Sequence, residues 1–181
     1  MPLQADAARA VTVLDLSVVR CRTPTGKRRL LVSASGPERS KAGVLGRLEN
    51  EYSLREFLTS PWAPRPLALT NEEGAATLVL EDPGGTPLEV LMKSPLTLVE
   101  KLCAATAMAG ALAELHASGI IHKDIKPADL LVNLTSGLAS ITGFCIATRL
   151  PRERHVLDTP NRNGNSRLHG ACADRAHEPR R

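Results

Sequence analysis

The sequence predicts an α+β protein made of two unlike lobes, one β-rich and one helical, with a cleft between them. Before residue 81 the apolar runs are short and separated by turn residues, as is typical of strands, and only one stretch has helical spacing. The longest helical periodicity follows over residues 97–117, after an extended EDPGGTP connector. A polar loop between two short apolar runs completes this order.

The first 80 residues are expected to hold two pairs of strands and one helix. The runs VTVLDLSVV and LLVSA, within residues 8–34, are separated by TPTGK, which predicts two strands and a turn at 25–27. The stretch GVLGRLENEYSLREFL, over 43–58, places apolar side chains at the spacing of an amphipathic helix. The runs RPLALT and ATLVLED, joined by a polar NEEG turn, predict the second pair of strands.

Residues 97–117 predict a long helix that ends at Ser118–Gly119, since glycine is the usual residue just past a helix end. Six apolar residues would share one face of this helix: Leu98, Leu102, Ala105, Ala109, Leu112 and Leu115. The next segments, IIHKDIKPADLLVN and LASITGFCIATRL, predict a loop flanked by short apolar runs and then a strand with a further loop. Periodicity stops at about residue 155, which predicts a disordered tail over 155–181.

Composition and charge exclude several classes of protein. The net charge of +4 lies entirely in residues 149–181, where eight arginines face four acidic residues, so the body of the chain is neutral and a nucleic-acid partner is not expected. No run approaches the roughly 18 apolar residues of a membrane span, and the N-terminus lacks a secretory signal pattern. The four cysteines are scattered, without metal spacing. A cytoplasmic protein is expected.

Residues 122–129, HKDIKPAD, carry the candidate chemistry. Phosphoryl transfer from a nucleotide needs a carboxylate that orients the attacking hydroxyl, a cation near the moving phosphoryl group and oxygen ligands for Mg²⁺. Asp124 and Lys126 are two residues apart, so in an extended loop their side chains face the same side. The alternative interpretation is a solvated polar loop.

This segment resembles the catalytic loop of protein kinases, and its Lys-Pro pair resembles the serine/threonine subclass. In the same way, ELHASGIIHKD resembles the kinase helix before that loop, LLVN the strand after it and EDPGGTPL the hinge. Glu51 occupies the place of the helix glutamate that pairs with a strand lysine. Over residues 10–154 the sequence is similar to the kinase-like front domain of large bacterial proteins that also carry an ATPase module and a sensor histidine kinase.

The resemblance implies a bilobal protein-kinase-like fold, with an N-lobe over 1–80, a hinge over 81–86 and a partial helical C-lobe over 87–154. It implies ATP and Mg²⁺ as cofactors and hydroxyl groups of a protein substrate as phosphoryl acceptors. The site residues that it implies are Asp124 and Lys126 for catalysis, Glu51, Glu81 and Lys126 for nucleotide binding, and Asp129 as metal ligand.

Departures from the kinase pattern argue against efficient catalysis. The place of the strand lysine falls at Val32 or Ser33, so Glu51 has no evident cationic partner and is equally well explained as a solvated surface residue. No Gly-rich loop precedes that strand. The metal-binding D-F-G triplet reads Gly143-Phe144-Cys145, without its carboxylate. Asp129 replaces the usual asparagine, and its oxygens can ligate a hard cation.

Each missing charge is worth several powers of ten in rate in comparable phosphoryl-transfer sites. Three hypotheses therefore stay open. The chain is a weak serine/threonine kinase, a non-catalytic pseudokinase module that binds partners, or a truncated gene product without function.

The tail departs from the resemblance altogether. In that family RLPRER continues into a segment like GTLAYMAPEQTGRMNR, whereas this chain reads GNSRLHGACADRAHEPR. Back-translation of residues 164–180, read from the second base of each codon, permits GTLAYMAPxQTGRMNR in unbroken order. This match predicts a shift of the coding frame near residues 155–162. The next kinase helices would then be missing, and the face through Leu102, Ala109 and Leu112 would stay partly exposed.

Overall fold

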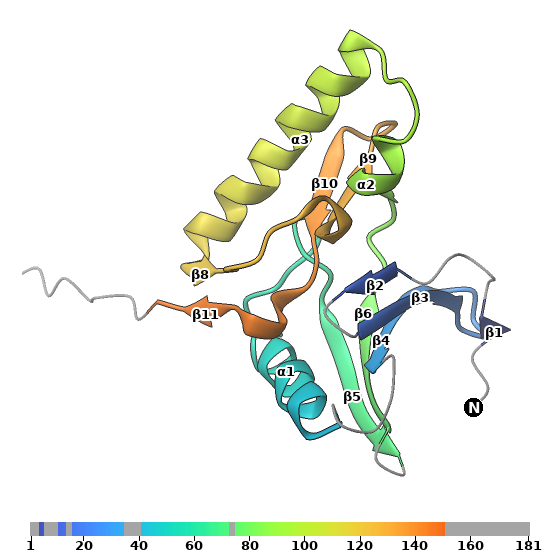
Figure 1. Cartoon of the computed structure of the whole chain (residues 1–181), viewed down its shortest axis with the longest axis vertical. Helices are drawn as coiled ribbons and strands as arrows, with labels where there is room; N and C mark the ends of the chain where they lie inside the picture. Colours follow the sequence, from blue (N-terminus) through green and yellow to red (C-terminus); the bar gives the residue numbers. More distant parts are fainter. Residues whose placement is uncertain (1–3, 6–10, 14–15, 35–40, 73–74, 151–181) are drawn as a thin grey trace, which may run out of the picture.

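The computed structural model describes residues 4–5, 11–13, 16–34, 41–72 and 75–150. The predicted tail over 155–181, with its proposed change of reading frame, lies outside these residues. In Figure 1 the long helix α3 forms one end of the described molecule, and the strands β5 and β6 reach toward the other.

The β-rich lobe is an antiparallel sheet in the order β1-β3-β4-β6-β5, with β2 paired to β3. Its strands are β1 (Gln4–Ala5), β2 (Val11–Val13), β3 (Leu16–Arg22), β4 (Arg28–Ala34), β5 (Pro66–Glu72) and β6 (Ala75–Glu81). The predicted turn at 25–27 closes the β3–β4 hairpin. The run VTVLDLSVV is not one strand, because it folds back on itself as β2 and β3, with Val11 opposite Val18.

The helix α1 (Lys41–Ser53) packs on this sheet, next to β5 and β6 (Figure 1). It ends five residues earlier than the sequence predicts, and turns follow over 54–57. Val44 and Leu48 of α1 are buried with Leu30, Leu78 and Leu80 of the sheet. Burial of these side chains stabilises the lobe by roughly 1.5–3 kcal/mol each.

A short connector, residues 82–85, leads from β6 to the second lobe. This lobe contains β7 (Thr86–Pro87), α2 (Leu88–Leu91), α3 (Leu98–Ala117), β8 (Ile120–Ile121), β9 (Leu130–Asn133), β10 (Leu138–Ile141) and β11 (Thr148–Arg149). Strands β10, β9 and β7 form one small sheet, and β11 pairs with β8. Gly85 lies against β9 with φ of 79°, and a Cβ there would be 2.9 Å from the Val132 carbonyl carbon, so this close approach requires glycine.

The long helix α3 begins and ends where the sequence predicts, but it buries another face. Its buried residues are Ala104, Ala107, Ala111 and Leu115, which contact β9 and β10. Leu98 is 71% exposed and Leu102 is 59% exposed, and Ala105 and Ala109 are exposed as well. The predicted six-residue apolar face is therefore not the buried one, except near its C-terminal end, where Leu115 is buried. Small alanines let the helix approach the sheet closely. Leu102 and Ala109 are exposed and Leu112 is half-buried, so the partial exposure expected along these three residues is observed.

The segment that follows α1 joins the core of the second lobe. Leu58 and Trp62 are buried there with Phe144, whose ring meets the Trp62 ring edge-on at 6.1 Å between centroids. The Ile141 N–H donates to the Trp62 carbonyl oxygen at 2.7 Å, and the Ser140 hydroxyl donates to the carbonyl oxygen of Pro61. A segment of the first 80 residues is thus built into the helical lobe, and the predicted lobe boundaries stay a prediction.

None of the helices in the described part of the chain combines the length with the apolar character that a membrane span requires. The predicted cytoplasmic location and the expected absence of a nucleic-acid partner stay predictions from composition.

Candidate functional site

A cavity of about 220 Å³ lies between the β-rich sheet and two segments of the second lobe, the loop that precedes β9 and the loop that follows β10. Its apolar wall comes from both sides: Leu16, Val18, Leu30, Val32 and Leu80 from the sheet, and Leu131 from β9. Its charged side chains are Arg20 of β3, Arg47 and Glu51 of α1, and Asp124, Lys126 and Asp129 of the loop. Four of the five predicted site residues therefore line one cavity.

The predicted catalytic pair is in direct contact. The Lys126 Nζ atom is 3.0 Å from Asp124 Oδ2 and 4.0 Å from Asp129 Oδ2. Pro127 starts a 3₁₀ turn over Pro127–Asp129, in which the Asp129 N–H donates to the Lys126 carbonyl oxygen at 2.9 Å. The turn carries Asp129 back toward the lysine, so one ammonium group faces two carboxyl groups.

His122 links this loop to the segment that follows β10 through hydrogen bonds of its ring. Its buried ring lies 2.8 Å, through Nε2, from the Thr142 carbonyl oxygen, which can only accept, so Nε2 carries a proton. The Nδ1 atom then accepts the Asp124 N–H at 3.4 Å. Burial lowers the pKa of His122, which favours the neutral ring that both bonds require. The backbone at Lys123 has φ of 75°, an uncommon conformation for a residue with a side chain, and such conformations gather at functional sites.

Asp129 is 2% exposed, and burial raises the pKa of its carboxyl group to about 7, against the opposing effect of Lys126. Its Oδ1 atom fills the space beside Gly143, where a Cβ would lie 3.1 Å from it. Gly143 also has φ of 82°. The residue that would carry the second metal carboxylate in a kinase is thus a glycine packed against Asp129.

The residues present do not fit a protein-held Mg²⁺ ion. In the part of the chain that the structure describes, no group of three His, Cys, Asp or Glu side chains is placed to hold a metal. Three carboxyl groups line the cavity, those of Glu51, Asp124 and Asp129, and the raised pKa values of Glu51 and Asp129 leave these two partly protonated at pH 7. The role of Asp129 as metal ligand stays a prediction.

Glu51 is not a solvated surface residue, because it is only 2% exposed. Burial raises the pKa of its carboxyl group to about 7, although hydrogen bonds from the Cys145 thiol and the Phe144 N–H oppose the rise. The Cys145 Sγ atom donates to Glu51 Oε2 at 3.0 Å. Burial, followed by the charge of Glu51, raises the pKa of that thiol.

Of the two strand positions considered for the kinase lysine, Val32 and Ser33, only Val32 lines the cavity. Ser33 points to the other face of β4, and its hydroxyl lies 3.1 Å from that of Ser17. Glu51 therefore shares the cavity lining with a valine at that strand position, and its hydrogen-bond donor is the Cys145 thiol. Glu81, the remaining predicted residue, ends β6 and is not among the residues that line the cavity.

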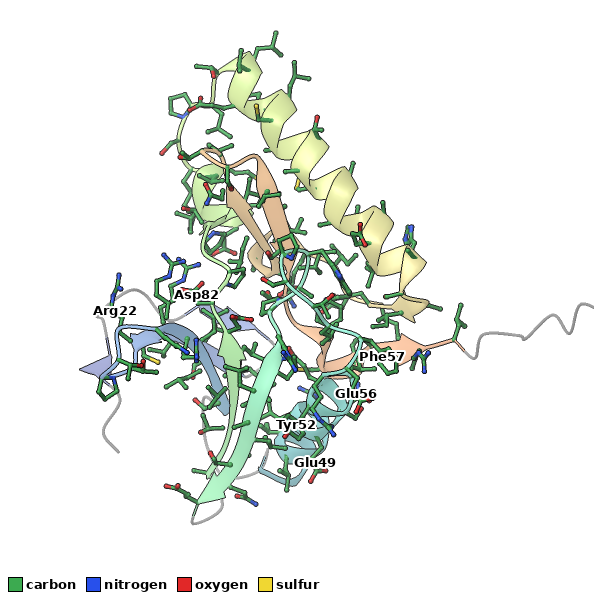
Figure 2. The ribbon with its side chains drawn as sticks, turned by 180° about the vertical axis from the view of Figure 1, so that it is seen from behind. Arg22, Glu49, Tyr52, Glu56, Phe57 and Asp82 are labelled. Atoms are coloured by element: carbon green, nitrogen blue, oxygen red, sulfur yellow. The ribbon has the colours of Figure 1, made fainter. Side chains whose placement is uncertain are left out.

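Sequence reasoning missed an ionic cluster at the connector. The buried Asp82 carboxyl oxygen Oδ2 lies 3.3 Å from Arg20 Nε and 3.2 Å from Arg28 Nε, and Arg20 Nη2 donates to the Gly85 carbonyl oxygen at 2.8 Å. Figure 2 shows Asp82 on the same side of the molecule as Arg22, at the end of the β3–β4 hairpin. The alternation Leu16, Val18, Arg20 in β3 was the available signal, because residues two apart share one face.

Sequence reasoning also missed Arg47. It precedes Glu51 by one helical turn, so both side chains lie on one face of α1, and both line the cavity.

No family model matches the chain, but comparison with known proteins finds kinases that are similar to it in sequence. The chain is 34% identical over 130 residues to serine/threonine-protein kinase PkaA of Streptomyces coelicolor, a match that covers 67% of this chain and 24% of the relative. It is 39% identical over 80 residues to serine/threonine-protein kinase PknA of Mycobacterium tuberculosis, covering 42% of this chain and 18% of the relative.

A third relative is human Citron Rho-interacting kinase, which is 30% identical over 111 residues, covering 60% of this chain and 5% of the relative. The chain thus spans a quarter or less of the length of these curated relatives. All three relatives are named as kinases, and two of them as serine/threonine-protein kinases. The chain is a fragment of a serine/threonine protein-kinase-like domain, with a β-rich N-lobe and part of a helical C-lobe.

Proposed function

We propose that this chain binds ATP, or a related nucleoside polyphosphate, in the cavity between its lobes and transfers the phosphoryl group slowly or not at all. One observation carries the proposal: the cavity combines two apolar walls with the Asp124–Lys126 pair at one end. A planar base fits between Val18 and Val32 of the sheet and Leu131 of β9, and phosphates fit beside the cations. The proposal places the hinge at residues 81–86, as the sequence predicts.

The roles in transfer follow from the loop geometry. Asp124 would orient a substrate hydroxyl and take its proton as the oxygen attacks the terminal phosphorus atom. The bond between that phosphorus and the bridging oxygen would break, and the nucleoside diphosphate would leave. Lys126 would reduce the negative charge on the moving group.

Two supports that such a step needs are missing. Val32 provides no cation at the strand position, and Gly143 provides no carboxylate for a metal. In related sites the loss of one charged group of this kind lowers the rate by about 10³-fold or more. Binding without efficient turnover is therefore the function that the geometry favours.

Binding is tested by Val18→Phe, which fills the cavity from its sheet wall. We expect ATP to raise the melting temperature of the unmodified chain and to have little effect on this variant. Val19→Phe is the matched control, because Val19 is the next residue of β3 and points to the opposite face of the sheet. Equal ATP responses in all three proteins, or no response in the unmodified chain, would overturn the proposal.

Turnover is tested on the same proteins with ATP labelled at the terminal phosphate and a mixed protein substrate. We expect incorporation near background, unchanged by Asp124→Asn. Incorporation that is clearly above background and abolished by Asp124→Asn would instead establish a working kinase. That result would refute the non-catalytic part of the proposal and leave nucleotide binding intact.

A further inference from the structure

Lys126, the cation at the loop end of the cavity, is flanked by two carboxyl groups. Its Nζ atom lies 3.0 Å from Asp124 Oδ2 and 4.0 Å from Asp129 Oδ2. A phosphate group that approaches this lysine therefore meets both carboxyl groups as well. A metal ion between the phosphate and the carboxylates would offset that repulsion, but no set of described side chains in this region fits a protein-held Mg²⁺ ion. The loop end thus offers a phosphate little net attraction.

The arginines of the cavity do not supply the missing positive charge. Arg20 is paired with the buried Asp82 at 3.3 Å and donates to the Gly85 carbonyl oxygen at 2.8 Å, and Arg47 has an interaction partner of its own. Among the described residues, the three cations that line the cavity face its three carboxyl groups and also Asp82, which Arg20 shares with Arg28 outside the cavity. The cavity therefore has no marked excess of positive charge for a triphosphate.

Most of the uncharged lining of the cavity is apolar, and it comes from both lobes. Leu30 and Leu80 of the sheet and Leu131 of β9 are at most 7% exposed. Walls of this kind bind a flat ring, because its faces leave water on binding. The loop end differs, since the Asp124 and Lys126 side chains there are 39% and 30% exposed. The phosphates of a bound nucleotide can therefore stay hydrated while its base is buried.

We propose that the cavity recognises the nucleoside part of its ligand, an uncharged planar base with its sugar, and gains little from the phosphates. This inference rests on the proposed nucleotide binding. Adenosine then binds about as tightly as ATP, and Mg²⁺ makes little difference to either. ATP is held by its base and sugar, and its phosphates are not fixed for transfer, which agrees with slow or absent turnover.

Titration calorimetry with adenosine and with ATP, each in Mg²⁺ and in a chelator, tests the inference on the unmodified chain. We expect the four dissociation constants to agree within about threefold. One charged hydrogen bond to a phosphate would already favour ATP by about 10-fold or more, so the two cases are well separated.

Val32→Lys tests the physical reason, because it places a cation on the cavity wall at the strand position that lacks one. We expect this variant to bind ATP about 10- to 100-fold more tightly than adenosine. Ser33→Lys is the matched control, because Ser33 is the next residue of β4 and points to the opposite face of the sheet. It should show no preference for ATP.

Each other outcome has a defined meaning. An unmodified chain that binds ATP at least 10-fold more tightly than adenosine, or binds ATP only with Mg²⁺, would overturn the inference and leave the nucleotide site standing. A clear preference for adenosine would overturn it as well, because the phosphates would then oppose binding. If neither ligand binds, the proposed function itself fails.

The two lysine variants decide whether the missing cation is the cause. No preference for ATP in Val32→Lys, or an equal preference in Ser33→Lys, would overturn that explanation. Melting curves recorded without ligand verify that each variant is folded. If Val32→Lys does not fold, the four titrations of the unmodified chain decide the inference.

Discussion

Asp129 lies in an environment that differs strongly from that of an ordinary carboxylate in water. It is buried between Lys126 and Gly143, and no metal carboxylate stands beside it. Burial disfavours the charged form, and the single ammonium group at 4.0 Å does not compensate for the lost hydration. The folded chain therefore holds a proton on Asp129 that the unfolded chain releases at much lower pH.

This proton makes stability depend on pH at one residue. The pKa of Asp129 rises from 3.8 in the unfolded chain to about 7 in the folded one, so between these values the native state binds more protons and stability falls as pH rises. Above pH 7, where Asp129 is ionised in both states, the folded chain bears the full free-energy cost of burying the charged carboxylate. We expect Asp129→Asn to stabilise the protein by on the order of 2 kcal/mol at pH 8, and the gain to vanish near pH 4.

Urea unfolding of both proteins at pH 4.5, 6, 7 and 8 measures the difference. Glu89→Gln is the control, because Glu89 is partly exposed, forms only a 4.0 Å pair with Lys93, and its loss should change stability little at any pH. A constant difference between Asp129→Asn and the unmodified chain across the whole range would contradict the assignment.

The sequence revealed some site residues and hid others for a physical reason. Asp124, Lys126 and Asp129 fall within six residues, so a local motif is enough to place them together. The bond between Glu51 and Cys145 joins residues 94 apart, and the Arg20–Asp82 ion pair joins β3 to the connector that follows β6, a strand that is not a neighbour of β3 in the sheet. Such contacts depend on how strands and helices pack, which spacing along the chain does not encode.

At the scale of elements, α3 shows what a periodic pattern specifies and what it leaves open. Its length and both ends were predictable, because Thr97 and Glu100 form a capping box and Gly119 follows its end. Its buried face was not predictable from side-chain size, since the alanines face the strands and the leucines at its start face outward. Which face of α3 is buried is decided by its close packing against β10, a tertiary contact.

The capping box gives the element-scale prediction. The Thr97 hydroxyl accepts the Glu100 N–H at 3.2 Å, and the Glu100 carboxylate accepts the Thr97 N–H at 2.8 Å, a bond that also lowers the pKa of Glu100. We expect Thr97→Ala to destabilise the protein by about 1 kcal/mol, because a free N–H at the first turn loses its acceptor. Thr106→Ala, at an exposed interior position of α3, is the control and should be neutral or slightly stabilising. Equal stabilities of the two variants would show that the first turn of α3 does not limit folding.

At the scale of the whole molecule, the two lobes are held together by contacts between α1 and the turn Phe144–Ile146. The Asn50 amide nitrogen lies 3.3, 3.2 and 3.0 Å from the carbonyl oxygens of Phe144, Cys145 and Ala147. An amide has two hydrogens, so three acceptors share two donors. Beside it, Glu51 accepts the Cys145 thiol. The same helix therefore supplies side chains to the cavity and fixes their distance from the opposite lobe.

Asn50→Ala tests this coupling. It removes the donors of three carbonyl groups that are partly shielded from water, and we expect a loss of about 1–3 kcal/mol in the free energy of unfolding. Because Glu51 and Arg47 lie on the helix that this contact positions, we also expect weaker ATP binding than in the unmodified chain. Glu49→Ala, the neighbouring residue on the outer side of α1 (Figure 2), is the control for both measurements. A variant that loses stability but keeps full ATP affinity would mean that α1 holds the lobes together without setting the geometry of the cavity.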